Sequence, residues 1–481
     1  MTTAEQPPYQ RKGSPQVLTR GDYGGQAGYF IAHHRPNLKR HREEFRDHEG
    51  GHYYAISKEE FMTDARTWLN ASGAWGKPEK KDGNPVAEEF RPSAKDVSEI
   101  VEALKAMAFL ADRVTAPCWL RERPDAPPAD ELLAFPTGIF DLRNGNFYAP
   151  TPRLYTHFAA GFDYDHKAPT PGQWIKFLDE VFKGEQDQIG LLQEIFGYCL
   201  TSDTRHQKIF NLVGDKRSGK GTITRILKAL CAEGTVVEPT LSSLGEPFGK
   251  QQLIGKQIGI INDARVDRRS DGSAIAVVLL SSSGGDGHTV GRKYMSPWHG
   301  ELPIRWFIIS NEMLKFVDSS AALATRFITL VTRQSFLGKE DLLLGDRLKA
   351  ELPGIMNWTL DGLIRLRQRG RFPETQTSVD ARRHLTAMMS DIASFADERL
   401  VFESTAVTPK AEVFAARREW LREHGMADAS DGAFSRALLA AMPGRIHATR
   451  TVIGGKQVQV YAGVRLAPGV VAQGGDDALP F

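Results

Sequence analysis

Cysteine is scarce in this sequence, and its scarcity argues against two classes of structure. The 481 residues include three cysteines, Cys118, Cys199 and Cys231, which lie far apart and form no CxxC pair. We therefore expect neither a disulfide framework nor a cysteine-rich zinc site. No apolar run is long enough to cross a bilayer, and the first residues lack the apolar core of a signal peptide. We expect a cytoplasmic protein without a membrane partner.

The sequence also lacks a large excess of either basic or acidic residues. Lys and Arg total 61, and Asp and Glu total 59. The overall charge therefore neither requires nor excludes a nucleic-acid partner, and only its distribution can decide. Hydrophobic residues make up 41% of the chain, which is enough for sizeable cores. The length suits about two to four domains.

One apparent zinc motif is not expected to work. The letters from His48 to His52, HEGGH, match the protease pattern HExxH, which places two histidines on one face of a helix. The two adjacent glycines disfavour a helix there. We interpret the segment as a solvated loop.

The order of apolar patterns predicts an α/β chain. Residues 96–133 have helical spacing, the sequence around Asn144-Gly145 predicts a β-hairpin, and residues 171–200 predict two amphipathic helices. Between 208 and 330, the apolar runs IFNLV, IGII and IRWFIIS suit buried strands of a largely parallel sheet. Polar residues 367–386 indicate a domain boundary.

A phosphate-binding loop follows the first of these strands. It consists of Gly214, Asp215, Lys216, Arg217, Ser218, Gly219, Lys220, Gly221 and Thr222, and a helical pattern follows it. Strand before and helix after is the context that a P-loop requires. Backbone N–H groups can surround phosphate oxygens there, and Lys220 would reach the β- and γ-phosphates. The sequence therefore predicts ATP binding.

The usual Ser or Thr after the lysine is replaced by Gly221, with Thr222 next. Adenylate kinases share this GKGT ending. A metal-binding acid is expected on a neighbouring strand, and Asp263 follows the strand IGII. We predict that Thr222 and Asp263 bind Mg²⁺; the alternative for Asp263 is a turn cap.

Two further residues are candidates for the hydrolysis of ATP. Asn311 ends the strand IRWFIIS and can position the attacking water, or it can simply cap the strand. Arg326 precedes the apolar run FITLV, and a guanidinium suits γ-phosphate charge, often from a neighbouring subunit. Taken alone, it could be an ordinary surface arginine.

Two segments are candidates for DNA binding. The glycine-rich residues 281–303 include His288, Arg292, Lys293 and Tyr294, and a cation beside an aromatic can grip phosphate and stack on bases. In the second segment, the stretch from Phe434 to Leu466 has no Asp or Glu and five basic residues: Arg436, Arg445, Arg450, Lys456 and Arg465. Such a field suits a DNA backbone, although a basic packing module is an alternative.

The C-terminal pattern predicts a winged helix. Residues 409–425 and 431–442 have amphipathic helical spacing, and Gly454-Gly455 joins two strand-like runs as a hairpin turn.

Taken together, the motifs resemble superfamily 3 helicases. The segments GDKRSGKGT, IGIINDAR, LLSSSGGDGHTVGRKY, WFIISNEM and ALATRF are similar to that family's Walker A, Walker B, B-prime, motif C and arginine-finger segments. The similarity is closest to the helicase part of phage and plasmid primase-helicases, including poxvirus-type relatives. It covers residues 96–335 and, more weakly, the C-terminal block; the first 90 or so residues resemble no family we can name.

The resemblance implies roles for particular residues. Lys220 contacts phosphate, Asp263 serves the metal, Asn311 is the sensor, and Arg326 acts across a subunit boundary. Lys293 and Tyr294 match the hairpin-tip pair that grips single-stranded DNA, where viral members often have Lys-His. Asn262 replaces the first of two Walker B acids, which puts the metal geometry in question.

We therefore expect an AAA+-like P-loop ATPase with ATP and Mg²⁺ as cofactors and single-stranded or forked DNA as partner. The resemblance implies a hexameric ring, 3′→5′ movement and replication of a mobile element in a bacterial host. No paired-carboxylate primase motif precedes the helical region, so we do not expect primer synthesis, and a separate primase or initiator is a candidate partner. Two alternatives remain: an ATP-switched replication initiator and a P-loop phosphotransferase.

The sequence suggests five regions along the chain. They are residues 1–95 of unknown role, a helical domain at 96–205, the ATPase domain at 206–370, a winged-helix-like domain at 387–466, and a disordered tail at 467–481.

Overall fold

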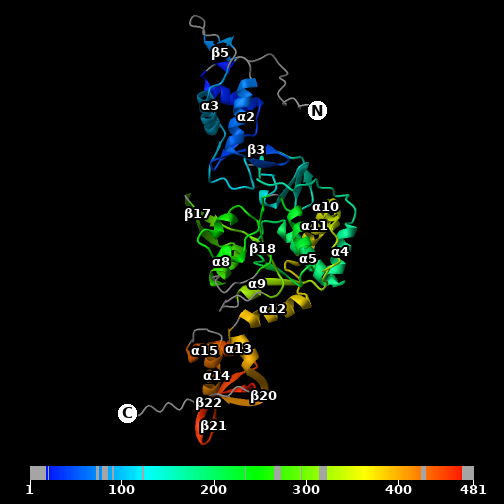
Figure 1. Cartoon of the computed structure of the whole chain (residues 1–481), viewed down its shortest axis with the longest axis vertical. Helices are drawn as coiled ribbons and strands as arrows, with labels where there is room; N and C mark the ends of the chain where they lie inside the picture. Colours follow the sequence, from blue (N-terminus) through cyan, green and yellow to red (C-terminus); the bar gives the residue numbers. More distant parts are fainter. Residues whose placement is uncertain are drawn as a thin grey trace, which may run out of the picture. The chain divides into compact units, whose positions relative to one another are not determined.

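The structure is a computed structural model, drawn in Figure 1 with colours that follow the sequence. The chain divides into two compact units. One unit contains the chain up to Thr170 with residues 228–234 and 352–357, and the other contains the remainder. The structure describes residues 18–19, 21–71, 75–78, 85–88, 91–121, 124–232, 234–264, 272–293, 295–313, 322–389, 391–423 and 430–468.

Three helices and a four-stranded sheet make up the core of the first unit. The elements are α1 (Tyr23–His33), β2 (Lys39–His41), β3 (Glu44–Glu49), β4 (His52–Ile56), α2 (Lys58–Ala71), α3 (Ala94–Met107) and β7 (Phe109–Leu110), with sheet order β4-β3-β2-β7. A capping box between Ser93 and Asp96 starts α3. The helix then buries Ile100 and Leu104 in one core with Phe30, Phe61 and Trp68.

That shared core removes one of the predicted boundaries. A division at residues 95 and 96 would separate α3 from the helices on which its apolar face packs. The predicted helical domain at 96–205 is also crossed by the division at Thr170. The boundary depends on the burial of one face of α3 against residues distant in sequence. The local spacing of apolar residues does not indicate which distant residues that face packs on.

Short strands complete the first unit. They are β1 (Leu18–Thr19), β5 (Trp75–Pro78), β6 (Pro85–Glu88), β8 (Cys118–Trp119), β9 (Leu132–Phe135), β10 (Gly138–Asp141), β11 (Phe147–Tyr148) and β12 (Leu154–Tyr155), with the short 3₁₀ helix η1 (Ala129–Glu131). The hairpin predicted around Asn144-Gly145 is confirmed, because β10 pairs with β11 across it. The HEGGH letters lie on the β3–β4 hairpin, where Glu49 pairs with His52. The segment is therefore not helical, but its interpretation as a solvated loop is wrong, because His48 pairs with Tyr53 and is only partly exposed.

The second unit begins with the two predicted helices, α4 (Gly172–Phe182) and α5 (Gln186–Cys199). Their apolar faces are buried, as the periodicity predicts. The carboxylate of Glu351 accepts hydrogen bonds from the backbone N–H groups of Gln173 and Trp174, each at 3.0 Å. Those donors have no partner within α4 itself, so Glu351 caps the helix from a distant part of the chain.

A five-stranded parallel sheet is the centre of this unit. Its strands are β13 (Ile209–Val213), β14 (Val236–Val237), β15 (Ile258–Ile261), β18 (Arg305–Ser310) and β19 (Phe327–Val331), in the order β14-β15-β18-β13-β19. The helices that belong to it are α6 (Lys220–Leu230), α7 (Leu241–Leu244), α8 (Gly272–Gly284) and α9 (Ala322–Arg326), with the 3₁₀ helix η2 (Gly249–Leu253). The mixed α/β class and the parallel sheet are confirmed.

Three helices follow β19: α10 (Leu344–Ala350), α11 (Leu352–Arg369) and α12 (Gln376–Met389). The predicted boundary at 367–386 is therefore largely helical. Leu385 of α12 joins the core of the parallel-sheet region, and the hydroxyl of Ser378 accepts from the backbone N–H of Thr329 at 3.4 Å. The parallel-sheet region therefore extends beyond residue 370, where we predicted its end.

The C-terminal part has its own core. Its elements are α13 (Asp391–Arg399), β20 (Leu400–Pro409), α14 (Lys410–Glu423), α15 (Asp431–Ala441), β21 (His447–Ile453) and β22 (Lys456–Leu466), with sheet order β20-β22-β21. Phe395, Trp420, Phe434 and Tyr461 fill the centre. The two predicted helices and the Gly454-Gly455 hairpin are confirmed as elements. Residues 469–481, most of the predicted tail, lie outside the described residues.

Candidate nucleotide site and nucleic-acid surfaces

The glycine-rich loop connects the carboxyl end of β13 to the first residue of α6, which is Lys220. Gly219 has φ +88°, and a Cβ there would lie 2.8 Å from a methyl of Val181 and 3.0 Å from the ring of Phe177. Only glycine combines that conformation with that packing. The loop therefore turns tightly enough to direct the first N–H groups of α6 toward a ligand.

The ammonium of Lys220 is buried inside the loop. It donates to the carbonyl oxygens of Gly214 at 2.5 Å and Asp215 at 2.6 Å, and to Oδ1 of Asn311 at 3.3 Å. Burial lowers the pKa of Lys220, and the nearby Asp215 and Asp263 oppose that shift. A cation held mainly by neutral oxygens can exchange them for a phosphate oxygen, because charged acceptors bind it more strongly.

Asn311 and Asp263 complete a chain of contacts with Lys220. The Asn311 amide donates to Oδ1 of Asp263 at 3.3 Å, so Asn311 contacts both charged residues. β15, β18 and β13 are parallel neighbours, and their carboxyl ends therefore meet at one sheet edge. Asp263 has φ +47°, a conformation that non-glycine residues adopt at a cost and that is common at functional sites.

Sequence reasoning missed an acid beside the Walker B position. Asn262 stands where the family resemblance leads us to expect the first of two acids. Its Nδ2 donates to Oε1 of Glu238 at 2.9 Å. Glu238 directly follows β14, the next strand along the sheet. The apolar pair that forms β14 is too short for a sequence pattern to register, so only the sheet order reveals this neighbour.

The metal candidates also lie at this edge. The hydroxyl of Thr222 accepts from the guanidinium of Arg225 at 2.9 Å, and both Thr222 and Asp263 line the same cavity. Among the described residues, no cluster of three His, Cys, Asp or Glu side chains could hold a metal ion. A hydroxyl and a carboxylate nevertheless suit Mg²⁺, which binds few protein ligands and keeps several waters.

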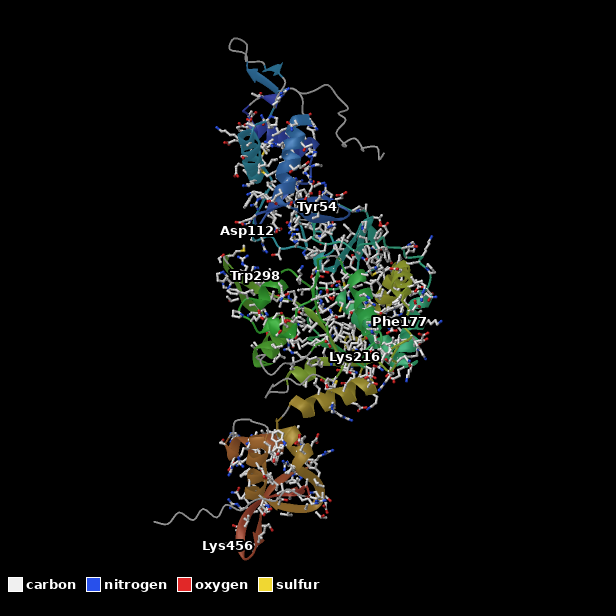
Figure 2. The ribbon with its side chains drawn as sticks, in the orientation of Figure 1. Tyr54, Asp112, Phe177, Lys216, Trp298 and Lys456 are labelled. Atoms are coloured by element: carbon white, nitrogen blue, oxygen red, sulfur yellow. The ribbon has the colours of Figure 1, made fainter. Side chains whose placement is uncertain are left out.

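A cavity of about 1080 Å³ surrounds the loop. Two of the residues that line it, Phe177 and Lys216, are labelled in Figure 2. The basic residues that line the cavity are Lys176, Lys216, Arg217, Lys220, Arg225, Lys339, Arg347 and Lys349, and the acidic ones are Glu180, Asp263, Glu340 and Asp341. This excess of positive charge suits an anionic ligand the size of a nucleoside triphosphate.

The segment after β19 covers one side of the loop. The Ser335 hydroxyl donates to the carbonyl of Lys216 at 3.1 Å, and the Phe336 N–H donates to the carbonyl of Arg217 at 2.8 Å. Residues of this segment and of α4 line the cavity. The sequence did not predict that either segment lines the site, because neither has a recognised motif.

Arg326 lies at the opposite edge of the sheet from the loop. Phe327, the next residue, pairs with Ile209 at the start of β13, whereas the loop follows the end of that strand. The guanidinium of Arg326 donates to the carbonyl of Leu280 and to the Ser283 hydroxyl at 3.0 Å. The structure therefore does not bring Arg326 together with Lys220, Asp263 and Asn311 within one chain.

The predicted DNA-gripping excursion is a hairpin of β16 (Gly287–Arg292) and β17 (Met295–Glu301). Lys293 at its tip is exposed, and Arg292 donates to the carbonyl of Ser296 at 2.9 Å. Tyr294 lies outside the described residues. His288 is buried, and burial lowers its pKa. The sequence predicted a DNA contact for this residue, but a buried ring is not placed for direct contact with DNA.

The three C-terminal arginines are exposed, as a DNA-binding role requires. Arg436 lies on α15, Arg450 on β21, and Arg445 precedes β21 with its guanidinium 5.4 Å from the ring centroid of Phe402. The structure places them on three successive parts of one small domain.

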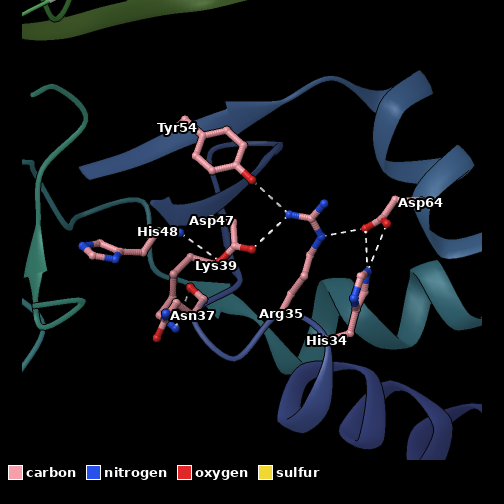
Figure 3. A network of polar contacts seen from close by, with 8 residues as sticks. All are labelled: His34, Arg35, Asn37, Lys39, Asp47, His48, Tyr54 and Asp64. Atoms are coloured by element: carbon pink, nitrogen blue, oxygen red, sulfur yellow. Dashed lines mark hydrogen bonds and ion pairs between the residues drawn. The ribbon is translucent and has the colours of Figure 1, made fainter. Parts of the chain in front are cut away.

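A partly buried polar network in the first unit had no sequence signal. Arg35 donates to Asp64 at 2.6 Å, to Asp47 at 3.0 Å and to the Tyr54 hydroxyl at 3.1 Å, and Nε2 of His34 lies 3.0 Å from Asp64 (Figure 3). Burial opposes ionisation of Asp64, but its bonds to His34 and Arg35 outweigh burial and lower its pKa. The network connects the end of α1 to β3, β4 and α2, and loss of Arg35 would remove an ion pair from each of the partly buried carboxylates of Asp47 and Asp64.

Two family models match separate parts of the chain. The model described as "D5 N terminal like" matches residues 27–183, and the model described as "Family of unknown function (DUF5906)" matches residues 212–326. The first match begins within the N-terminal region for which the sequence analysis names no relative, and it crosses the predicted boundary at 95 and 96. It agrees with the resemblance to primase-helicases.

Solved structures show weak similarity over most of the chain. "The apo structure of NrS-1 C terminal region (305-718)" is 14% identical with a TM-score of 0.46, covering 84% of this chain and 100% of that one. "The A form apo structure of NrS-1 C terminal region-CTR" is 13% identical with a TM-score of 0.43, covering 83% and 98%. These similarities are too low to indicate a shared function.

No helix in the described part of the chain combines the length and hydropathy needed to span a bilayer.

Proposed function

We propose that this chain is an ATP-dependent, ring-forming DNA helicase that moves 3′→5′ in the replication of a phage, plasmid or other mobile element. The observation that carries the proposal is the contact chain from Lys220 through Asn311 to Asp263 at the carboxyl edge of the parallel sheet. The position of β13 between β18 and β19 supports an AAA+-like P-loop core.

Different residues of this chain would carry out different parts of ATP hydrolysis. ATP with Mg²⁺ would supply a phosphoanhydride bond whose cleavage releases free energy. Lys220 and the first N–H groups of α6 hold negative charge, and Thr222 and Asp263 offer oxygens to the cation. Asn311, fixed between Lys220 and Asp263, is placed to orient a water. Phe177 and Phe336 offer apolar cavity wall beside these charges.

The position of Arg326 supports a ring. β13 has five residues, and at about 3.3 Å each they put roughly 16 Å between the two sheet edges. An arginine on the far edge serves a phosphate site only when another subunit presents it. Repeated head-to-tail contacts of that kind close into a ring, and the family resemblance suggests a hexamer.

The exposed Lys293 on the β16–β17 hairpin supports a motor that holds single-stranded DNA through phosphate contacts. The exposed Arg436, Arg445 and Arg450 support recruitment to duplex or origin DNA by a winged-helix domain. We propose that a separate primase or initiator acts with it.

A strand-displacement assay on forked DNA tests the proposal, with 3′-tailed and 5′-tailed forks compared in the presence and absence of ATP. We expect ATP-dependent unwinding of forks that offer a 3′ tail, and none by Lys220→Ala. Absence of unwinding by protein that hydrolyses ATP would contradict it.

Asn262 at the Walker B position favours one alternative, an initiator that uses ATP as a switch. Tight ATP binding and origin binding without steady turnover would indicate that alternative. Phosphate transfer from ATP to a nucleoside monophosphate, with no stimulation by single-stranded DNA, would instead indicate a phosphotransferase.

A further inference from the structure

The β21–β22 hairpin extends beyond the sheet to which it belongs. β20 pairs with β22 only from Val460 to Leu466, whereas residues 456–459 of β22 pair with β21 alone. The outer part is therefore a two-stranded ribbon, closed by Gly454 at φ +58° and Gly455 at φ +80°. Four residue pairs at about 3.4 Å each give it a reach of roughly 13 Å. Lys456 marks its tip in Figure 2.

The tip exposes an apolar pair. Val452 is 68% exposed and Ile453 is 44% exposed, while the core of this domain begins further along the hairpin at Val460 and Tyr461. These two side chains contribute little to folding of the domain. Their area is also too small for a stable protein interface, which needs several hundred square ångströms on each partner.

The side chains around the pair suit nucleic acid. Arg450 is opposite Gln459 and Val452 is opposite Gln457, and directly paired residues of a ribbon share one face. That face therefore combines one guanidinium and two amides with one apolar residue, Val452. Ile453 and Lys456 are opposite each other on the other face of the ribbon. No Asp or Glu occurs between residues 432 and 468. Guanidinium and amide groups are the side chains that hydrogen-bond to base edges.

The shape selects duplex DNA among nucleic acids. A two-stranded ribbon fits a DNA groove, whereas the major groove of an RNA duplex is too deep and narrow for side chains to read. Single-strand binders stack bases on aromatic rings, and residues 447–459 include no Phe, Tyr or Trp. Apolar side chains at the tip of a groove-binding element are known to insert between base steps and unstack them.

We propose that the β21–β22 ribbon enters duplex DNA through Arg450, Gln457 and Gln459, and that Val452, on the same face, inserts at a base step to loosen the base pair ahead of the motor. The proposal rests on the proposed function for its DNA partner. It gives the C-terminal domain a part in strand separation, in addition to recruitment.

The test uses the full-length chain without ATP, so that it does not depend on the motor. A fork labelled with fluorescein reports affinity by anisotropy, and 2-aminopurine at the junction reports unstacking by increased fluorescence. We expect Val452→Ser to weaken fork binding about ten-fold and to lose the 2-aminopurine increase. The matched control is Val407→Ser, an exposed valine on β20, which should behave as the unmodified chain.

Each outcome separates this proposal from the helicase assignment. Equal fork affinity and an equal 2-aminopurine increase in Val452→Ser would overturn the proposal while ATP-driven unwinding could still be present. An equal loss of affinity for single-stranded DNA would also overturn it, as would loss of self-association in place of fork binding. A wild-type chain that unstacks the junction but hydrolyses no ATP would support the ribbon and refute the motor.

Discussion

Replacement of Arg326 by Ala tests whether the site is shared between subunits. In the isolated chain, this arginine bonds to Leu280 and Ser283 of α8, at the amino edge of the parallel sheet. With roughly 16 Å of strand between the edges, it cannot reach a phosphate held by Lys220 of its own chain. We therefore expect Arg326→Ala to bind ATP normally and to lose hydrolysis.

The expected loss is large because an arginine finger stabilises charge that develops mainly in the transition state. Known cases lie at about 10³-fold or more in kcat. Arg326→Lys keeps the charge but cannot reproduce the planar, two-pronged geometry, so it should recover only part of the activity. The lost contacts to α8 should cost only about 1 kcal/mol each in stability, which a thermal melt would check.

Mixing experiments give a quantitative expectation. In a ring assembled from equal amounts of Arg326→Ala and Lys220→Ala chains, about one interface in four would combine an intact lysine with an intact arginine from its neighbour. Steady-state ATPase should therefore recover toward about a quarter of the wild-type rate per site, although each variant alone is inactive. Native mass spectrometry would verify that mixed rings form.

Two results would refute this reasoning. One is near-normal hydrolysis by Arg326→Ala, which would make the residue an ordinary stabiliser of α8. The other is no recovery in verified mixed rings, which would require the arginine and the lysine to act within the same chain.

Three further predictions concern the site, the DNA surface and the first unit. Lys220→Ala should abolish ATP turnover in a coupled assay, because its ammonium is the buried cation of the loop; near-normal turnover would contradict the P-loop assignment. Lys293→Ala/Tyr294→Ala should remove DNA stimulation and unwinding while basal hydrolysis persists; unwinding of forks at the wild-type rate would exclude a gripping role. Burial lowers the pKa of His157 to about 3, so protonation favours the unfolded chain and stability falls as pH drops from 6.5 toward 3. His157→Phe should reduce that slope by up to about 1.4 kcal/mol per pH unit, as measured by denaturant titration at several pH values. His166→Phe, at an exposed histidine of the same unit, is the control, and an unchanged slope in His157→Phe would contradict the shift.

The candidate site was predictable in part because its signals are local. Gly219 is required by a conformation that glycine tolerates best, and the strands before Gly214, Asp263 and Asn311 are continuous apolar runs that only a buried parallel sheet accommodates. The same locality explains what was missed. Ser335 and Phe336 reach the loop, and Glu238 reaches Asn262, from segments without a pattern of their own. A polar composition did not prevent α12 from forming a helix.

The sequence alone determined the elements with strong local signals, such as β13, α4, α5 and the Gly454-Gly455 turn, because glycine conformation and the periodicity of apolar residues act between near neighbours. Only the tertiary structure decided that α3 shares a core with α1 and α2 and that His288 is buried. It also decided that Lys220, Asn311 and Asp263 form one contact chain while Arg326 lies at the other sheet edge. Those facts depend on strand order and on burial between distant residues, and the free energy of such packing is not encoded in any single window of the chain.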